Sequence, residues 1–156
     1  MKISKRLVTI CNLVKPGLGV ADVGADHGLV EMYLLDNNIS PYIVAIENKK
    51  GPYTILKNAL LGYENVRISL SDGIEDIDEK IAILVLAGIG GINVVNILKK
   101  DIEKLAKIQQ IVVDAHRDLA LVKDTIHELG FDIEKEVEII EANKKYNIVS
   151  FVRRRK

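Results

Sequence analysis

Short apolar runs alternate with segments of helical periodicity along most of the chain, and this alternation constrains the fold more than any other feature. The apolar runs predict strands at residues 19–23, 42–47, 65–70, 81–87 and 109–114. The periodic segments predict helices at residues 3–15, 28–38, 52–61, 91–106 and 118–129. Strands that alternate with helices are typical of a parallel sheet with helices on both faces.

The alternation ends after residue 130. Two strand-like runs, 131–142 and 146–153, follow each other with only Asn143-Lys144-Lys145 between them. So short a link joins antiparallel strands, because a parallel crossover needs a dozen or more residues. We therefore predict a single domain over residues 1–156, with an α/β doubly wound sheet that is mostly parallel and has one antiparallel strand at its edge.

The composition excludes several classes of protein. No apolar run reaches the ~18 residues that a membrane helix needs, and the N-terminus lacks the apolar stretch of a secretory signal. The single cysteine, Cys11, excludes an intramolecular disulfide and a cysteine-cluster metal site. Twenty-two basic residues balance 22 acidic ones, so the net charge does not indicate nucleic-acid binding. We expect a cytoplasmic protein with no membrane partner and no metal ion.

A glycine turn follows the first predicted strand, where doubly wound sheets bind their ligands. It reads Asp22-Val23-Gly24-Ala25-Asp26-His27-Gly28. The pattern differs from the dinucleotide form, Gly-x-Gly-x-x-Gly, because Asp26 replaces the middle glycine. A carboxylate there would repel a pyrophosphate but tolerate a cationic ligand. S-adenosylmethionine fits this requirement, since it carries a sulfonium and an ammonium and no phosphate; a purely structural turn is the alternative.

Three more polar or glycine-rich segments follow later strands. Glu47 ends the second strand, 23 residues after Gly24, where an acid accepts hydrogen bonds from ribose hydroxyls. Asp72 follows the third strand and could accept from an adenine amino group. The glycines of residues 87–91 leave open backbone after the fourth strand. Each segment could also be an ordinary turn, but their joint occurrence at successive strand ends favours one cofactor site.

The segments DVGADHG, AIENKKGP, SDGI and LAGIGG occur in this order, and the combination resembles the bacterial tRNA (adenine(22)-N(1))-methyltransferases. That family typically shows an Asp-Ile-Gly-Ser-Asp-His loop, a Glu-x-x-x-Gly-Pro segment, a Gly-Asp-Gly-Leu turn and an Ala-Gly-Met-Gly-Gly loop. The resemblance covers nearly the whole chain. It implies a Rossmann-like class I methyltransferase fold with a seven-stranded sheet whose last strand is antiparallel. It also implies S-adenosylmethionine as cofactor, tRNA as partner, and adenine N1 as methyl acceptor.

The resemblance also assigns positions around the cofactor. Asp22, Gly24 and Asp26 would line its methionine end, Glu47 would hold the ribose and Asp72 the adenine, while His27 and Gly88 would border the reaction centre. The predicted cofactor-binding residues are Asp22, Gly24, Asp26, His27, Glu47, Asn48, Asp72, Gly73, Ala87 and Gly88.

The segment after the fifth strand departs from the family. A Gln-Pro-Asn-like sequence is usual there, and this chain has Asp114-Ala115-His116-Arg117-Asp118 instead. A carboxylate could stabilise the charge that a methylated adenine gains, and a histidine could act as a base near neutral pH. We therefore predict Asp26, Asp114 and His116 as catalytic residues. In the alternative reading the segment is a polar loop, and Asp118 caps the next helix.

The partner and acceptor stay open at this point. Full-length family members carry a helical C-terminal domain after the sheet, and its absence here leaves a small-molecule or protein acceptor, or a non-catalytic S-adenosylmethionine-binding protein, as alternatives. It also suggests a partner chain, such as a second copy in a homodimer. The basic helix with Lys2, Lys5, Arg6 and Lys15, and the basic tail 153–156, could contact RNA phosphates or be solvated charges.

Overall fold

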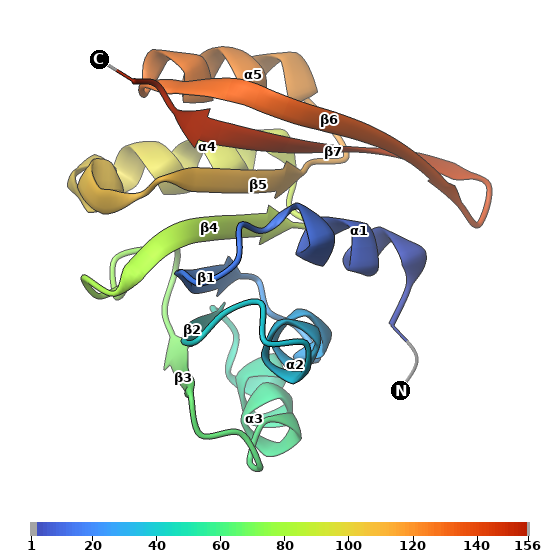
Figure 1. The fold of residues 1–156 in the computed structure, drawn as a ribbon, viewed down its shortest axis with the longest axis vertical. Coiled ribbons are helices and arrows are strands. Elements are labelled where there is room, and N and C mark those ends of the chain that lie inside the picture. Colours follow the sequence, from blue (N-terminus) through green and yellow to red (C-terminus); the bar gives the residue numbers. More distant parts are fainter. Residues whose placement is uncertain (1–2, 156) are drawn as a thin grey trace.

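The computed structural model describes residues 3–155, and it places them in one seven-stranded sheet with helices on both faces (Figure 1). The helices are α1 (Lys5–Leu13), α2 (Leu29–Asp36), α3 (Lys50–Ala59), α4 (Gly91–Lys100), the 3₁₀ helix η1 (Ile102–Lys107) and α5 (Leu119–Glu128). The strands are β1 (Gly19–Val23), β2 (Ile43–Glu47), β3 (Val66–Leu70), β4 (Ile81–Ala87), β5 (Gln110–Asp114), β6 (Phe131–Glu141) and β7 (Lys144–Arg153).

The strands lie in the order β3-β2-β1-β4-β5-β7-β6. The five strands β1 to β5 pair in parallel, and β7 is antiparallel to both of its neighbours. The predicted mostly parallel seven-stranded sheet with an antiparallel C-terminal strand is confirmed. The antiparallel strand is not at the edge, however, because β7 inserts between β5 and β6 (Figure 1).

The burial of the two hairpin strands explains this correction. Residues 148–151 of β7 are all buried, whereas β6 is mostly exposed and rich in charged side chains. A strand that is apolar on both faces gains more from an interior position, and a charged strand is suited to an edge that must resist pairing with another chain.

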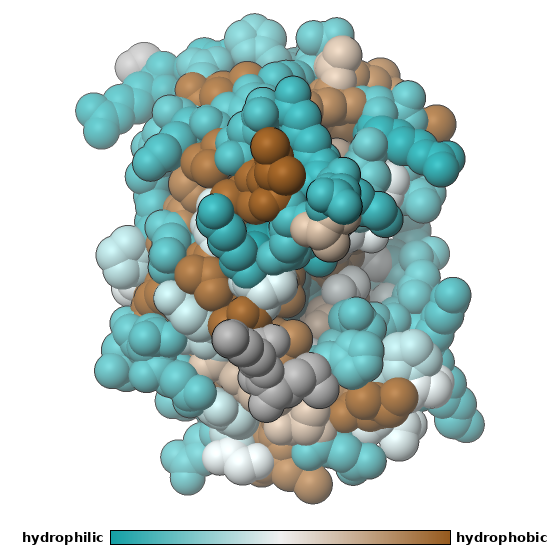
Figure 2. Space-filling model, turned by 90° about the vertical axis from the view of Figure 1, so that its right-hand side faces the viewer, coloured by the Kyte–Doolittle hydropathy of each residue, from teal (hydrophilic) through white to brown (hydrophobic). Residues whose placement is uncertain are grey.

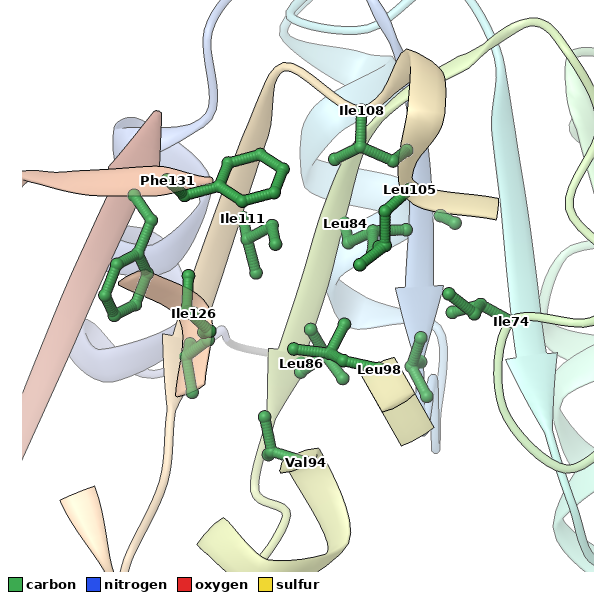
Figure 3. Packing of buried hydrophobic residues seen from close by; sticks show 14 of the residues in the cluster. Ile74, Leu84, Leu86, Val94, Leu98, Leu105, Ile108, Ile111, Ile126 and Phe131 are labelled. Carbon is green, nitrogen blue, oxygen red and sulfur yellow. The ribbon is translucent and has the colours of Figure 1, made fainter. Parts of the chain in front are cut away.

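Two layers of apolar side chains hold the helices on the sheet. Figure 3 shows one layer, in which Leu84 and Leu86 of β4 pack with residues of α4, η1 and α5. On the other face, Ile10 of α1 and Leu34 of α2 pack over Val85 and its neighbours on β1 and β5. The central strands are therefore buried on both faces, and their polar residues are confined to a few positions.

The predicted helix 91–106 is interrupted. Asp101 leaves helical geometry (φ −124°, ψ 52°), and the Lys104 N–H then donates to the Asp101 carbonyl at 2.9 Å, in the 3₁₀ pattern. This break lets Leu105 and Ile108 join the buried cluster that contains Leu98. The packing of the segment before β5 therefore determines where the helix ends. The helical periodicity of the sequence alone does not show this end.

Gly19 lies where β1 passes the start of β4, and we expect Gly19→Ala to destabilise the fold. A Cβ there would be 2.3 Å from the Lys80 carbonyl oxygen, which is backbone and cannot turn away. Overpacking of this kind typically costs about 1–3 kcal/mol. Gly62→Ala is the control, because a Cβ at Gly62 meets nothing within 4 Å. Urea unfolding followed by circular dichroism measures both, and equal stabilities would contradict the close approach.

Candidate functional site

A cavity of about 710 Å³ lies at the carboxyl ends of the strands. Figure 2 looks onto this end of the molecule, whose surface is hollowed near the centre of the view. The cavity is centred on β1, where the strand order reverses between β2 and β4, and doubly wound sheets bind ligands at this switch point. Its walls include all ten predicted cofactor-binding residues: Asp22, Gly24, Asp26, His27, Glu47, Asn48, Asp72, Gly73, Ala87 and Gly88.

The loop after β1 turns sharply away from the sheet. Gly24 has φ +77°, and the N–H groups of Gly24 and Ala25 both donate to the Ile46 carbonyl, at 2.9 and 3.0 Å. Asp26 also has a left-handed backbone (φ +56°), which aspartate tolerates better than most residues. Its side chain is exposed, with Oδ1 3.2 Å from Nδ1 of His27. The turn therefore directs a carboxylate and an imidazole to the mouth of the cavity.

Glu47 ties this loop to the end of β2. It is buried, and its Oε1 accepts from the Asp26 N–H at 3.4 Å while Oε2 accepts from the Asn48 N–H at 3.1 Å. Because backbone donors hold the carboxylate on both sides, its position at the cavity wall is set before any ligand binds. The acid at this strand end is therefore a fixed hydrogen-bond acceptor at the cavity wall.

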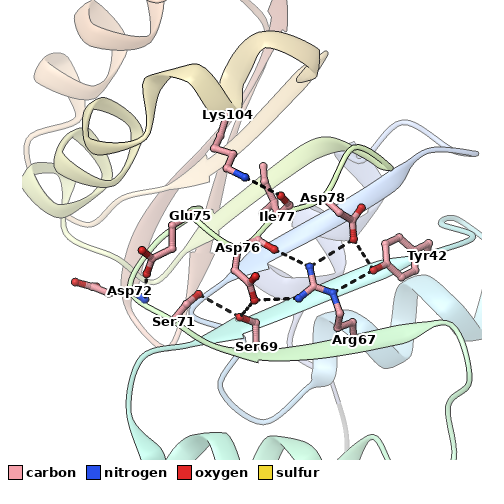
Figure 4. Close-up of polar contacts among 10 residues, drawn as sticks. All are labelled: Tyr42, Arg67, Ser69, Ser71, Asp72, Glu75, Asp76, Ile77, Asp78 and Lys104. Atoms are coloured by element: carbon pink, nitrogen blue, oxygen red, sulfur yellow. Dashed lines mark hydrogen bonds and ion pairs between the residues drawn. The ribbon is translucent and has the colours of Figure 1, made fainter.

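The turn that carries Asp72 is held by an ionic network at its far end (Figure 4). Arg67 donates through Nη1 to Oδ2 of Asp76 at 3.0 Å and through Nη2 to the Asp76 carbonyl at 2.6 Å. The Ser69 hydroxyl donates to the same Asp76 carboxylate at 2.6 Å. The Ser69 hydrogen bond and the Arg67 charge lower the pKa of Asp76. From the end of α4, Lys100 Nζ donates to the Asp72 carbonyl at 3.0 Å.

The glycines after β4 differ from one another. A Cβ at Gly88 or Gly90 would meet nothing within 4 Å, and Gly88 has φ +69°, so these two leave open backbone as predicted. Gly91 does not, because a Cβ there would be 2.3 Å from the Arg117 carbonyl oxygen. Gly91 therefore serves the close packing of α4 against the loop after β5.

The three predicted catalytic residues lie in different surroundings. Asp26 lines the cavity, whereas Asp114 lies behind the wall, fully buried and paired through Oδ2 with Nη1 of Arg6. Arg6 itself lines the cavity. His116 packs edge-on against Tyr146, with ring centroids 5.6 Å apart, and lines a separate hollow next to the β6–β7 hairpin.

The loop after β5 also corrects the helix-cap reading. Asp118 is the N-terminal flanking residue of α5, but its backbone is left-handed (φ +57°) and its side chain makes no capping hydrogen bond. Its carbonyl still accepts from the Val122 N–H at 3.1 Å, so the helix starts on backbone contacts alone.

Sequence reasoning missed Glu31, which follows the glycine loop in α2. Glu31 is fully buried beside Asp22 of β1, and burial raises the pKa of both carboxyl groups. Cys11 of α1 faces the same pair, and burial raises the pKa of its thiol. The sequence did contain a signal for this residue, because Glu31 is the acid in a segment, 29–35, whose other residues are almost all apolar.

The two basic segments do not form one patch at the cavity. Of the basic residues described in α1, Arg6 reaches the cavity. Arg153 and Arg154 lie at the opposite end of the sheet (Figure 1), where the side chains donate to the Ile108 carbonyl at 2.7 Å and to Asp132 at 3.1 Å. Lys2 and Lys156 lie outside the described residues. Protein groups thus occupy Arg153 and Arg154, away from the cavity.

Across residues 3–155, no group of three or more His, Cys, Asp or Glu side chains is placed to hold a metal ion. In the same part of the chain, no helix is both long and apolar enough to cross a membrane.

Comparison with known proteins agrees with this geometry. A model of the methyltransferase domain family matches residues 3–149. The chain is 26% identical over 155 residues to the tRNA (adenine(22)-N(1))-methyltransferase of Bacillus subtilis, covering 96% of this chain and 64% of that protein. It is 30% identical over 158 residues to MG248 of Mycoplasma genitalium, covering 93% of this chain and 67% of that protein. The chain thus spans just under two thirds of the Bacillus subtilis relative.

Solved structures show the same fold. The crystal structure of Streptococcus pneumoniae Sp1610 in complex with S-adenosyl-L-methionine superposes with a TM-score of 0.94 at 25% identity, covering 99% of this chain and 75% of that one. The Bacillus subtilis tRNA methyltransferase, at 23% identity, superposes with a TM-score of 0.93 and covers 97% of this chain and 67% of that one.

An inserted antiparallel last strand, a glycine turn after β1 and acids at the ends of the following strands together define a class I methyltransferase fold. The chain belongs to the methyltransferase domain family. Its relatives confirm the resemblance to the bacterial tRNA (adenine(22)-N(1))-methyltransferases that the motifs indicate.

We expect Arg6→Met to destabilise the fold by about 2 kcal/mol. The change leaves the Asp114 carboxylate buried without its cation, and the cost falls below the ~3–5 kcal/mol of a fully buried pair because Arg6 is 21% exposed. Lys15→Met is the control, since the Lys15–Glu134 pair is exposed and such pairs contribute ~0–1 kcal/mol.

Adding Asp114→Asn to the Arg6→Met variant should recover most of the loss, because it removes the uncompensated charge. Chemical unfolding of the four members of this cycle measures the coupling between the two residues. Strictly additive effects would show that the pair contributes nothing to the fold.

Proposed function

We propose that the protein is an S-adenosylmethionine-dependent methyltransferase that methylates N1 of an adenine in tRNA. One observation carries the proposal: the buried Asp22 and Glu47 and the exposed Asp72 meet in a single cavity at the ends of β1, β2 and β3. Acceptors in this order match a ligand with an ammonium at one end, a ribose in the middle and an adenine amino group at the other.

The chemistry of the cavity supports this cofactor over a dinucleotide. Its volume of about 710 Å³ is within the usual ~300–1,000 Å³ of small-molecule sites. Asp22 of β1 and Asp26 of the turn after it present carboxylates where a dinucleotide would place its pyrophosphate. These acids would repel an anion and attract a sulfonium or an ammonium. The open space at Gly88 leaves the backbone accessible to a second reactant.

When bound, S-adenosylmethionine supplies an electrophilic methyl group on a positively charged sulfur. The residues of the chain then position the acceptor in line and exclude water, which accounts for most of the catalysis such a reaction needs. Adenine N1 gains positive charge on methylation. We assign Asp26, exposed at the cavity mouth, to stabilise that charge or to accept the amino proton.

Asp114 has a different role in this proposal. Its contact with the cavity runs through Arg6, so we assign it to hold that arginine against the wall. His116 lies outside the cavity with Tyr146, where it is suited to contact the acceptor rather than the methyl group. With tRNA as the acceptor, the activity belongs to the cytoplasm.

A second candidate is methyl transfer to a small molecule or a protein. The loop 114–118 departs from the family at the acceptor side, and Arg153 and Arg154 of the tail bind protein groups away from the cavity. Both observations leave the cofactor site intact and weaken only the choice of tRNA.

The deciding experiment incubates the protein with methyl-labelled S-adenosylmethionine and unmodified tRNA, followed by digestion and identification of the labelled nucleoside. A tRNA with guanine in place of adenine 22 is the matched control. We expect labelled 1-methyladenosine from the first RNA alone. Confirmed cofactor binding without label in either RNA would favour the second candidate.

Glu47→Ala should weaken S-adenosylmethionine binding by about 1–3 kcal/mol, because the ribose hydroxyls lose their buried acceptor. Isothermal titration calorimetry measures the affinity. Glu103→Ala on η1 is the control, since this exposed acid lies outside the cavity. Equal affinities for the two variants would show that the ribose lies elsewhere.

Asp26→Asn should lower the rate of transfer by about 10²-fold, the lower range for a group that moves or stabilises a proton. Cofactor affinity should change far less, because Asp26 is exposed at the mouth of the cavity. Single-turnover rates and binding titrations separate the two effects. Equal losses in the transfer rate and in cofactor affinity would show that Asp26 is a cofactor ligand only.

A further inference from the structure

Two buried acids meet behind the cavity wall. Asp22 of β1 is 2% exposed and lines the cavity, while Glu31 of α2 is 0% exposed and lies behind it. Their carboxyl groups lie within hydrogen-bonding reach of each other. The pair therefore has one member that can meet a ligand and one that cannot.

Within residues 3–155, no other residue donates a hydrogen bond to the buried carboxyl oxygens of Glu31. Its own backbone N–H lowers the pKa of the group, but this effect is smaller than those of burial and of Asp22, which raise the pKa. The neighbouring titratable groups are Cys11 of α1, Asp26 of the loop and Glu47 of β2, and none of these is a cation. Arg6, the arginine of α1 that lines the cavity, is paired with Asp114.

Two carboxylates in contact without a cation cannot both be ionised at low dielectric. A proton held between them satisfies one oxygen of each residue, and burial favours keeping it on the member further from solvent. Asp22 faces the cavity and Glu31 does not, so the geometry puts the proton on Glu31 and the negative charge on Asp22.

We propose that Glu31 is a positioning residue for the cofactor: it remains protonated, donates a hydrogen bond to Asp22, and so fixes a single negative charge at the cavity wall to bind the ammonium of an amino-acid moiety. The inference rests on the proposed function, because it takes the ligand of this cavity to be S-adenosylmethionine.

The titration behaviour of the pair agrees with this arrangement. Burial raises the pKa of both groups; their mutual hydrogen bond raises the pKa of Glu31 further, whereas it lowers the pKa of Asp22. Glu31 therefore holds its proton to higher pH than Asp22. Because the pKa of Asp22 is raised overall, its charge disappears, as pH falls, at a higher pH than for an ordinary aspartate. Cofactor affinity should fall with it, since the ammonium stays protonated throughout.

Two variants of Glu31 separate positioning from packing. In Glu31→Gln the amide still donates to Asp22 but cannot titrate, so affinity for S-adenosylhomocysteine at pH 7.5 should stay within about threefold. In Glu31→Leu the donor is lost while the apolar surroundings are kept, so affinity should fall about tenfold or more, and the pH at which binding is lost should move upward. Thermal unfolding checks that both variants fold.

A third ligand makes the test specific. Methylthioadenosine shares the nucleoside of the cofactor but lacks its ammonium and carboxylate, so Glu31→Leu should leave its affinity unchanged. If Glu31→Leu weakens the binding of both ligands equally, or of neither, the inference is overturned. A wild-type protein that binds neither ligand would instead overturn the proposed function. If Glu31→Leu does not fold, the affinity of Glu31→Gln for S-adenosylhomocysteine is measured against pH. A difference of more than threefold from wild type at acid pH would also contradict the proposal.

Discussion

The site depends on the pairing of β1 with β2 on one side and β4 on the other. The chain builds outward from β1 to β3, then crosses to β4, so the carboxyl ends of four strands gather around the end of β1. Because β1, β2 and β4 are buried on both faces, they carry few polar side chains, and those present at their ends face the cavity. Register alone therefore brings Asp22, Glu47 and Gly88 together.

Electrostatics then defines what the cavity accepts. Asp22, Glu31 and Asp114 are buried on the side of the sheet that α1 and α2 cover, and Arg6 is paired with one of them. The remaining acids lie beside a cavity that also has Asp26 at its mouth. A cationic ligand compensates this charge, whereas a phosphate would add to it. The proposed cofactor, the assignment of Asp26 and the role of Glu31 all follow from the same excess of carboxyl groups.

The sequence predicts the strands and the residues that line the cavity well, because buried strands and the turns after them leave local signals in apolar runs and glycines. It does not predict that β7 inserts beside β5, since the short turn determines only that β6 and β7 pair. Asp114 and His116 are two residues apart, yet one points under α1 and the other packs on Tyr146. Such directions, like the burial of Glu31, depend on contacts between distant segments.

The place of β7 inside the sheet has a consequence for synthesis on the ribosome. Residues 144–153 are translated after the other six strands of this sheet, but they separate β5 from β6 in the finished sheet. Until they emerge from the exit tunnel, the outer edge of β5 has no partner and β6 has no strand to pair with. The nascent chain can assemble β1 to β5 early, yet it keeps an open edge, where chaperones bind and neighbouring chains can aggregate, until β7 has emerged and paired with β5.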